Sequence, residues 1–255
     1  MSTGKRSICG YKFVEPQLKA LRGLGTRLIL DNKDDIKKSY DDILGILNTE
    51  VNIMSTHTLV QLYVSPMRCF TFQDYQLAPT LEEYSYITGV EIKDQVTFIN
   101  INDLPKFHHI VEAIHLEKKK VEINLKPKGG THCFTLKFMI DKAITFVDAG
   151  SWNSFNVILD LLIYGILLFP NIKDIVELTS IRIFMSGNHV PTLLADTYYS
   201  IQLRNQKKKG TIVLCAPLLY ICFISHFPNK GHFVENKVNL KCSQRIISLT
   251  SDDIL

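Results

Sequence analysis

Two residues in the C-terminal half of the chain have the types that general acid/base chemistry uses. Asp196 lies in a predicted helix over residues 193–204, and His189 lies in the loop before it. Either side chain can take a proton from a substrate that lies within hydrogen-bond reach. The spacing does not fix such a geometry, and carboxylates in purely structural networks also have shifted pKa values. We therefore favour a structural ion pair or a helix cap over an active site here.

Side chains around Asp196 predict a structural polar network. A carboxylate buried without a partner is costly, so Asp196 should either lie at the wet edge of its helix or be paired. The candidate partners of Asp196 are Arg182, Arg204, Tyr198 and Tyr199. The chain has no G-x-S-x-G nucleophile elbow, and none of its cysteines has a recognisable protease context. These residues favour a protein that is not an enzyme, and they predict no cofactor.

A second group has metal-ligand types. His108, Glu112 and His115 are spaced i, i+4, i+7 in a predicted helix that Asp103 caps and that has Pro105 in its first turn. This spacing puts three donors on one side of a helix, as a zinc site requires. The order is not H-E-x-x-H, and compact paired ligands are missing. We favour a solvated helix edge over a metal site.

Two lysine clusters are the candidates for contact with phosphates. The first contains Lys118, Lys119, Lys120, Lys126 and Lys128, and the second contains Lys207, Lys208 and Lys209. The net charge of +4 permits nucleic-acid binding, but dedicated nucleic-acid domains are more strongly basic. Gly129 and Gly130 are not followed by the G-K-[ST] of a phosphate loop. We expect residues 117–128 to form a solvated loop.

The elements that must position these residues are mostly helical. Residues 68–77 alternate around a polar centre and predict a short β-hairpin, and Thr80 and Glu83 form a capping box for a helix that ends at Gly89. Apolar periodicity predicts further helices over residues 34–47, 56–63, 134–146, 157–169, 171–185, 211–227 and 239–249. Residues 134–139 also fit a strand. The fold class predicted is mainly α: one multi-helix globular domain with a small β-hairpin near residues 68–77.

Two apolar segments resemble membrane spans. Residues 157–169 are too few to cross a bilayer, contain Asp160 and stop at Pro170. Residues 211–227 contain Pro217, which we expect to kink or split the helix. Both are more typical of helices buried in protein, although hydropathy alone would flag them. We expect no association with a membrane.

Composition indicates a single intracellular domain. Hydrophobic residues make up 46% of the chain, and its six cysteines form no C-x-x-C pair. The start of the chain lacks the apolar core of a signal peptide. We expect residues 1–33 to be a poorly ordered arm and residues 34–255 to be the domain. Ser251–Asp253 looks like the cap of a helix that is cut off at Leu255, which predicts a C-terminal truncation.

Several motifs together resemble a known family. They are Arg68–Asp74, Gln76–Tyr84, Leu162–Gly165, Leu168–Ile172, Val190–Ser200, Phe233–Lys237 and Ser243–Arg245. Over about residues 34–255 the chain resembles a plant-specific, legume-abundant family of unknown function that is similar to the transposon-associated plant mobile domain. Ile221–Cys222 and Cys242 depart from the residues that this family favours, so a binding face there is in doubt.

The resemblance implies a helical, nuclear protein derived from a transposable element. It implies a non-enzymatic interaction module that acts with nucleic-acid-handling proteins or chromatin through a protein partner. Two alternatives stay open. One is sequence-nonspecific nucleic-acid binding through the lysine clusters. The other is a remnant of a metal-dependent hydrolase or nuclease that uses Asp196 and His189. Neither the residues nor the resemblance specifies the partner or the oligomeric state.

Overall fold

The structure is a computed structural model. It describes residues 11–19, 21–24, 42–43, 45–92, 105–128, 130–171, 174–207, 210–227 and 242–254. Parts of the predicted helix over 34–47, the expected cap Asp103 and the motif Phe233–Lys237 lie outside these ranges.

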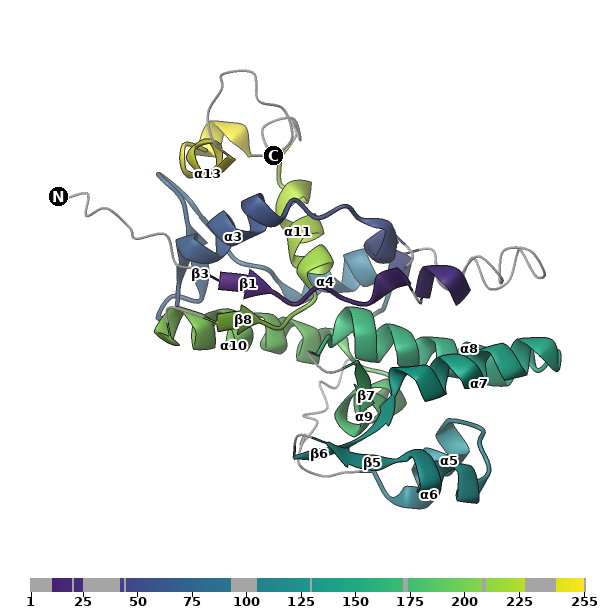
Figure 1. The fold of residues 1–255 in the computed structure, drawn as a ribbon. Helices are drawn as coiled ribbons and strands as arrows, with labels where there is room; N and C mark the ends of the chain where they lie inside the picture. Colours follow the sequence, from purple (N-terminus) through teal and green to yellow (C-terminus); the bar gives the residue numbers. More distant parts are fainter. Residues whose placement is uncertain are drawn as a thin grey trace.

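Helices make up most of the described chain, as predicted. They are α3 (Ile53–Leu62), α4 (Leu81–Thr88), α5 (Phe107–Ala113), α6 (Lys118–Asn124), α7 (Leu136–Asp148), α8 (Trp152–Ile163), α9 (Leu178–Ser186), α10 (Val190–Lys207), α11 (Ala216–Ser225) and α13 (Cys242–Ile247). A π-helical turn, η1 (Tyr164–Leu168), continues α8, and a 3-10 turn, η2 (Ser251–Asp253), follows α13. In Figure 1, α10 and α8 cross the middle of the molecule, with α3, α4 and α11 above them and α5 and α6 below.

Three small sheets join these helices. Strands β2 (Tyr63–Val64), β3 (Cys69–Thr71) and β4 (Gln76–Leu77) pair antiparallel and include the predicted hairpin. Strands β5 (Lys126–Lys128), β6 (Thr131–Thr135) and β7 (Ile175–Glu177) form a second antiparallel sheet. Strand β1 (Tyr11–Phe13) pairs parallel with β8 (Gly210–Ile212).

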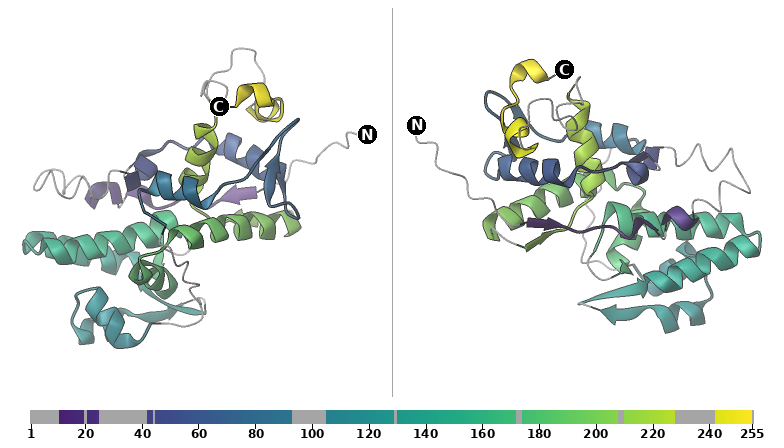
Figure 2. Two further views of the ribbon diagram at one scale, coloured as in Figure 1. Left: turned by 180° about the vertical axis from the view of Figure 1, so that it is seen from behind. Right: turned by 45° about the horizontal axis from the view of Figure 1, so that its top comes forward.

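Helix α11 belongs to both hydrophobic clusters of the molecule. Leu218 and Cys222 lie in the larger cluster, which is built mainly on α7, α8, η1 and α9. Leu219 and Phe223 lie in the smaller cluster, with residues of α3, β3 and α13. The views in Figure 2 also show α11 standing between α4 and α3. A helix that is apolar on all sides is stable only where protein surrounds it, and α11 meets that condition.

Helix α4 is the element that the sequence predicted best. The Thr80 hydroxyl accepts a hydrogen bond from the Glu83 N–H at 3.2 Å, and the Glu83 carboxylate accepts one from the Thr80 N–H at 2.7 Å. Gly89 ends the helix with φ of +68°, and the Asp42 carboxylate packs against its Cα. The fully buried Tyr84 bonds to Thr197 of α10 at 3.0 Å.

Residues 11–19 and 21–24 are the part of the expected N-terminal arm, 1–33, that the structure describes. Backbone hydrogen bonds hold β1 against β8, and the Val14 N–H donates to Ile212 O at 3.0 Å. Leu21 and Leu24 are 1% and 3% exposed in the larger cluster. These residues therefore pack on the domain, and the rest of the expected arm lies outside the described residues.

Four segments differ from their predicted secondary structure. Residues 118–124 form helix α6 where a loop was expected, because Val121 is buried while the lysines remain in solvent. Residues 131–135 and 175–177 are strands, since their backbone groups pair with each other. Residues 134–135 agree with the strand that was the alternative to a helix there. Residues 210–212 form β8, and Pro217 stands in the first turn of α11, where its missing N–H has no helical acceptor to lose.

The apolar run over 157–169 is divided between α8 and η1. Nearly all its side chains are buried against the molecule's own core. None of the described helices has the length and apolar character that a bilayer crossing requires.

The contact between η1 and β7 gives a stability test. A Cβ at Gly165 would lie 3.0 Å from both Cγ atoms of Val176, and β7 is fixed on its other side by β6. We expect Gly165→Ala to lower the free energy of unfolding by about 1–3 kcal/mol, the usual effect of overpacking a core. Urea denaturation measures it.

The control is Gly23→Ala, because a Cβ at that helical position meets nothing within 4 Å. We expect this change to be neutral or to stabilise by up to about 1 kcal/mol through helix propensity. Equal free energies of unfolding for the two variants would contradict the packing described for η1.

Candidate functional site

His189 is buried just before α10. It is 3% exposed, and its Nδ1 lies 2.6 Å from the Tyr164 hydroxyl. Burial lowers the pKa of His189 to about 4, so the imidazole is neutral at pH 7. Its Nε2 has no hydrogen-bond partner among the residues that the structure describes. The imidazole is buried, so His189 offers no exposed base to a substrate.

Asp196 lies on α10, two turns after His189, and is only partly accessible. Burial raises the pKa of this carboxyl to about 7. No neighbouring cation lowers that pKa, and within the described residues Asp196 makes no ion pair with Arg182 or Arg204. Desolvation, and not a charged partner, therefore determines the pKa of Asp196.

Two other members of the predicted network contact other parts of the chain. The Tyr198 hydroxyl donates to Pro79 O at 2.7 Å, while Tyr199 is 64% exposed. The Arg204 guanidinium packs against Gly210 at the start of β8. Tyr198 therefore links α10 to the segment before α4, and Arg204 links α10 to β8.

The three metal-ligand types at 108–115 do not converge. Helix α5 ends at Ala113, and His115 has φ of +51°, so the i, i+4, i+7 register does not extend to it. His108, Glu112 and His115 are all exposed. Among the described residues, no set of three ligand atoms close enough for one ion includes them.

The first lysine cluster is exposed on α6 and β5. Lys118, Lys119, Lys120, Lys126 and Lys128 all face solvent, and Lys120 pairs with Glu117 at 3.0 Å. Lys207 is exposed at the end of α10, and Lys208 and Lys209 lie outside the described residues. Figures 1 and 2 draw α6 with β5 and the end of α10 on different parts of the molecule.

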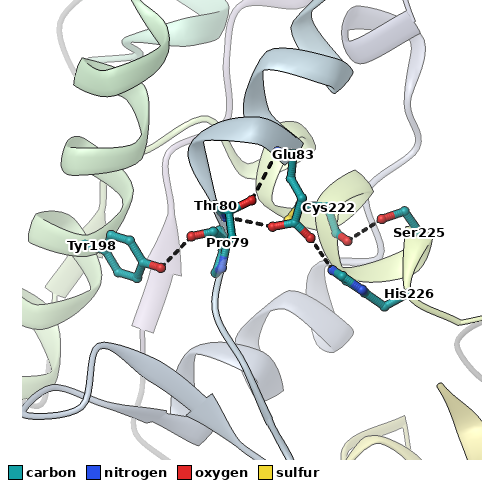
Figure 3. A network of polar contacts seen from close by, with 7 residues as sticks. All are labelled: Pro79, Thr80, Glu83, Tyr198, Cys222, Ser225 and His226. Atoms are coloured by element: carbon teal, nitrogen blue, oxygen red, sulfur yellow. Dashed lines mark hydrogen bonds and ion pairs between the residues drawn. The ribbon is translucent and has the colours of Figure 1, made fainter. Parts of the chain in front are cut away.

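A cluster that sequence reasoning missed lies between α4 and α11 (Figure 3). Glu83, Cys222 and His226 have one ligand atom each within 4.8 Å of one another. His226 Nε2 lies 2.5 Å from Glu83 Oε1, and the Cys222 thiol lies beside the same carboxylate. The signal in the sequence was C-x-x-x-H in a predicted helix, but nothing indicated that Glu83 would lie beside it.

An open groove lies at the C-terminal end of α4. It has a volume of about 710 Å³, and its walls come from the end of α4, from Ile221 of α11, and from Asp42, Gly45, Ile46 and Thr49. Tyr86 stands at its edge with 87% of its surface exposed. Asp42 and Glu91 are the charged residues in the described lining, and both are acidic. The groove combines apolar surface with negative charge.

The raised pKa of Asp196 gives a pH prediction. Its carboxyl changes from an ordinary value of 3.8 to about 7 on folding, so the folded state holds the extra proton between these values. Stability should fall as pH rises from about 4 to about 7, and Asp196→Asn should remove that fall. We expect the variant to be more stable than the natural chain by about 2 kcal/mol at pH 8, and equal to it near pH 4.

Urea denaturation at a series of pH values measures the difference. The exposed Asp141→Asn on α7 controls for the loss of one negative charge. A stability difference for Asp196→Asn that is the same at pH 4 and pH 8 would show that burial does not set the titration of this group.

Comparison with known proteins identifies a family. A family model described as a domain of unknown function (DUF7745) matches residues 21–255. No curated protein and no solved structure matched the chain. The match begins at Leu21, whose side chain is buried in the larger cluster, and it covers both hydrophobic clusters. The chain belongs to the family of domains of unknown function DUF7745.

Proposed function

We propose that this chain is a non-enzymatic interaction module that binds a basic segment of a partner protein in the groove beside α4. It extends the resemblance to the plant mobile domain: a nuclear module derived from a transposable element, acting with nucleic-acid-handling proteins or chromatin. Proteins of that class carry Lys- and Arg-rich segments, which are the chemical complement of an acidic groove.

The lining of the groove carries this proposal. Asp42 and Glu91 are both exposed, and the described lining contains no Lys or Arg to neutralise them. Ile87, Val90 and Ile221 are partly accessible and supply apolar contact. Tyr86 adds a large exposed aromatic side chain, a residue type that is enriched in binding hot spots. A partner segment with Lys or Arg next to one apolar side chain complements the charge and the apolar surface of this lining.

The departure that puts the family's own binding face in doubt falls in this groove. Ile221 is one of the positions at which the chain departs from the family that it resembles, and it lies in the groove lining. We infer that variation at this position changes which partner segment the groove accepts.

A peptide-binding experiment tests the groove. Short labelled peptides that combine Lys or Arg with one Leu or Phe should bind the purified chain, and peptides of the same composition with Glu in place of Lys should not. We expect Tyr86→Ala, and separately the pair Asp42→Asn and Glu91→Gln, to weaken binding about tenfold, which corresponds to about 1.4 kcal/mol. Fluorescence polarisation measures the dissociation constants.

The matched control is Tyr199→Ala, which removes a second exposed tyrosine, 64% exposed on α10 and outside the groove. It should leave binding unchanged. Equal affinity for basic and acidic peptides, or an equal loss in the Tyr86 and Tyr199 variants, would rule out the groove as the binding site.

Direct nucleic-acid binding is a second candidate, favoured by the exposed lysines of α6 and β5. Between Glu117 and Lys128 the chain has five lysines and two glutamates, a local charge of +3 on one small unit. Lysines that neutralise phosphates release counterions, so the affinity would fall steeply as salt rises.

Filter binding to random-sequence duplex DNA over a range of salt tests this candidate. Lys118→Glu with Lys119→Glu should weaken binding and lower the slope of log K against log salt by about 1 to 2. The charge-matched pair Lys12→Glu and Lys19→Glu, exposed near the N-terminus, should change the affinity less. An absence of binding even at low salt would exclude direct contact with the duplex.

A further inference from the structure

Three side chains with metal-ligand chemistry meet where α4 begins and α11 ends. Glu83 lies in the first turn of α4, and Cys222 and His226 are four residues apart at the end of α11. A spacing of i, i+4 puts two side chains on one face of a helix, and α11 directs that face at Glu83 (Figure 3).

The Glu83 carboxylate is held by two hydrogen bonds. It accepts one from His226, whose Nε2 is 2.5 Å from its Oε1, and the Cys222 thiol lies within 4.8 Å of both groups. Its second oxygen, Oε2, is held at 2.7 Å by the Thr80 N–H. Such hydrogen bonds from outside the cluster fix the orientation of a ligating carboxylate in metal sites.

The order of the contacts does not fit a catalytic cysteine. A nucleophilic thiol needs the imidazole beside it as a base, with the carboxylate behind the imidazole. Here the carboxylate lies between the thiol and the imidazole. Burial and the Glu83 charge also raise the pKa of the Cys222 thiol, which therefore stays protonated at pH 7 when no cation is bound.

We propose that Glu83, Cys222 and His226 bind one Zn²⁺ ion, with a water molecule as the fourth ligand. On binding, the Cys222 S–H bond breaks and its proton passes to the solvent, while the His226 imidazole moves its proton from Nε2 to Nδ1 and binds as the neutral ring. Bonds then form from zinc to Sγ, Nε2 and a Glu83 oxygen. One thiolate and one carboxylate balance the two positive charges, so the partly buried site is neutral, which lowers its desolvation penalty.

The ligand types select zinc over magnesium or calcium. Those cations prefer oxygen ligands, whereas thiolate and imidazole favour zinc and other late transition metals. Zinc ligands lie about 2.0–2.3 Å from the ion, which places neighbouring donors about 3.3–3.8 Å apart. Donor atoms within 4.8 Å need only small side-chain rotations to reach that spacing.

Access to the site is through its polar side. Cys222 is 2% exposed and forms the inner wall, while the Glu83 and His226 side chains are 24% and 31% exposed. A metal ion and its water can therefore reach the three donors from the surface without opening the core. This inference goes beyond the peptide-binding proposal, because it concerns the opposite end of α4.

Zinc titration of the purified, reduced, metal-stripped chain tests the proposal. We expect one Zn²⁺ to bind per chain at this site and the melting temperature to rise with zinc concentration. Co²⁺ in place of zinc should give a thiolate-to-metal charge-transfer absorption. Cys222→Ser should abolish that absorption, and His226→Gln and Glu83→Gln should each weaken zinc binding at least about tenfold.

Cys133→Ser is the matched control, because Cys133 is also 2% exposed and lies in β6, away from the cluster. It should keep the cobalt absorption and the zinc affinity. If Cys222→Ser fails to fold, the two variants of the partly exposed ligands still decide the question. An absence of zinc binding, or binding that His226→Gln and Glu83→Gln leave unchanged, would overturn the site.

Discussion

Burial of most of α11 is the constraint on which the arrangement of the molecule depends. Its sequence offers almost no polar face, so it cannot lie on a surface. The chain meets this constraint by packing one hydrophobic cluster against Leu218 and Cys222 and another against Leu219 and Phe223. Helices α3, α4 and α10 are positioned around it as a result, and the end of α11 is brought to the start of α4.

The sequence predicted well those features whose causes are local. Thr80, Glu83 and Gly89 determine the limits of α4 through hydrogen bonds within a few residues and through one left-handed backbone position. The mainly helical class and the hairpin near residues 68–77 follow from patterns of similar range. Strand β7 was missed, and part of β6 was only an alternative to a helix, because Cys133 and Glu177 pair across more than forty residues and apolar runs of that length also fit helices.

Among the candidate site residues too, features with local causes were predicted and features that depend on the tertiary fold were not. Asp196 was identified by its type, and its raised pKa depends on burial that no local pattern reveals. The arginines expected to pair with it are on the same or a preceding helix, but sequence proximity does not determine which way a side chain points. Glu83 was recognised only as a capping residue. Its second role required knowing that α11 ends beside it, which is a property of the tertiary fold.

The pairing of β1 with β8 has a consequence for the order of folding. Tyr11 lies opposite Gly210, and Phe13 lies opposite Ile212, so nearly 200 residues separate the two strands along the chain. During synthesis the first strand has no partner until residue 212 has left the ribosome. Closing so long a loop is entropically unfavourable and is compensated only when the intervening helices are already compact. The N-terminal strand is therefore expected to pair with β8 only after the helices between the two strands have packed.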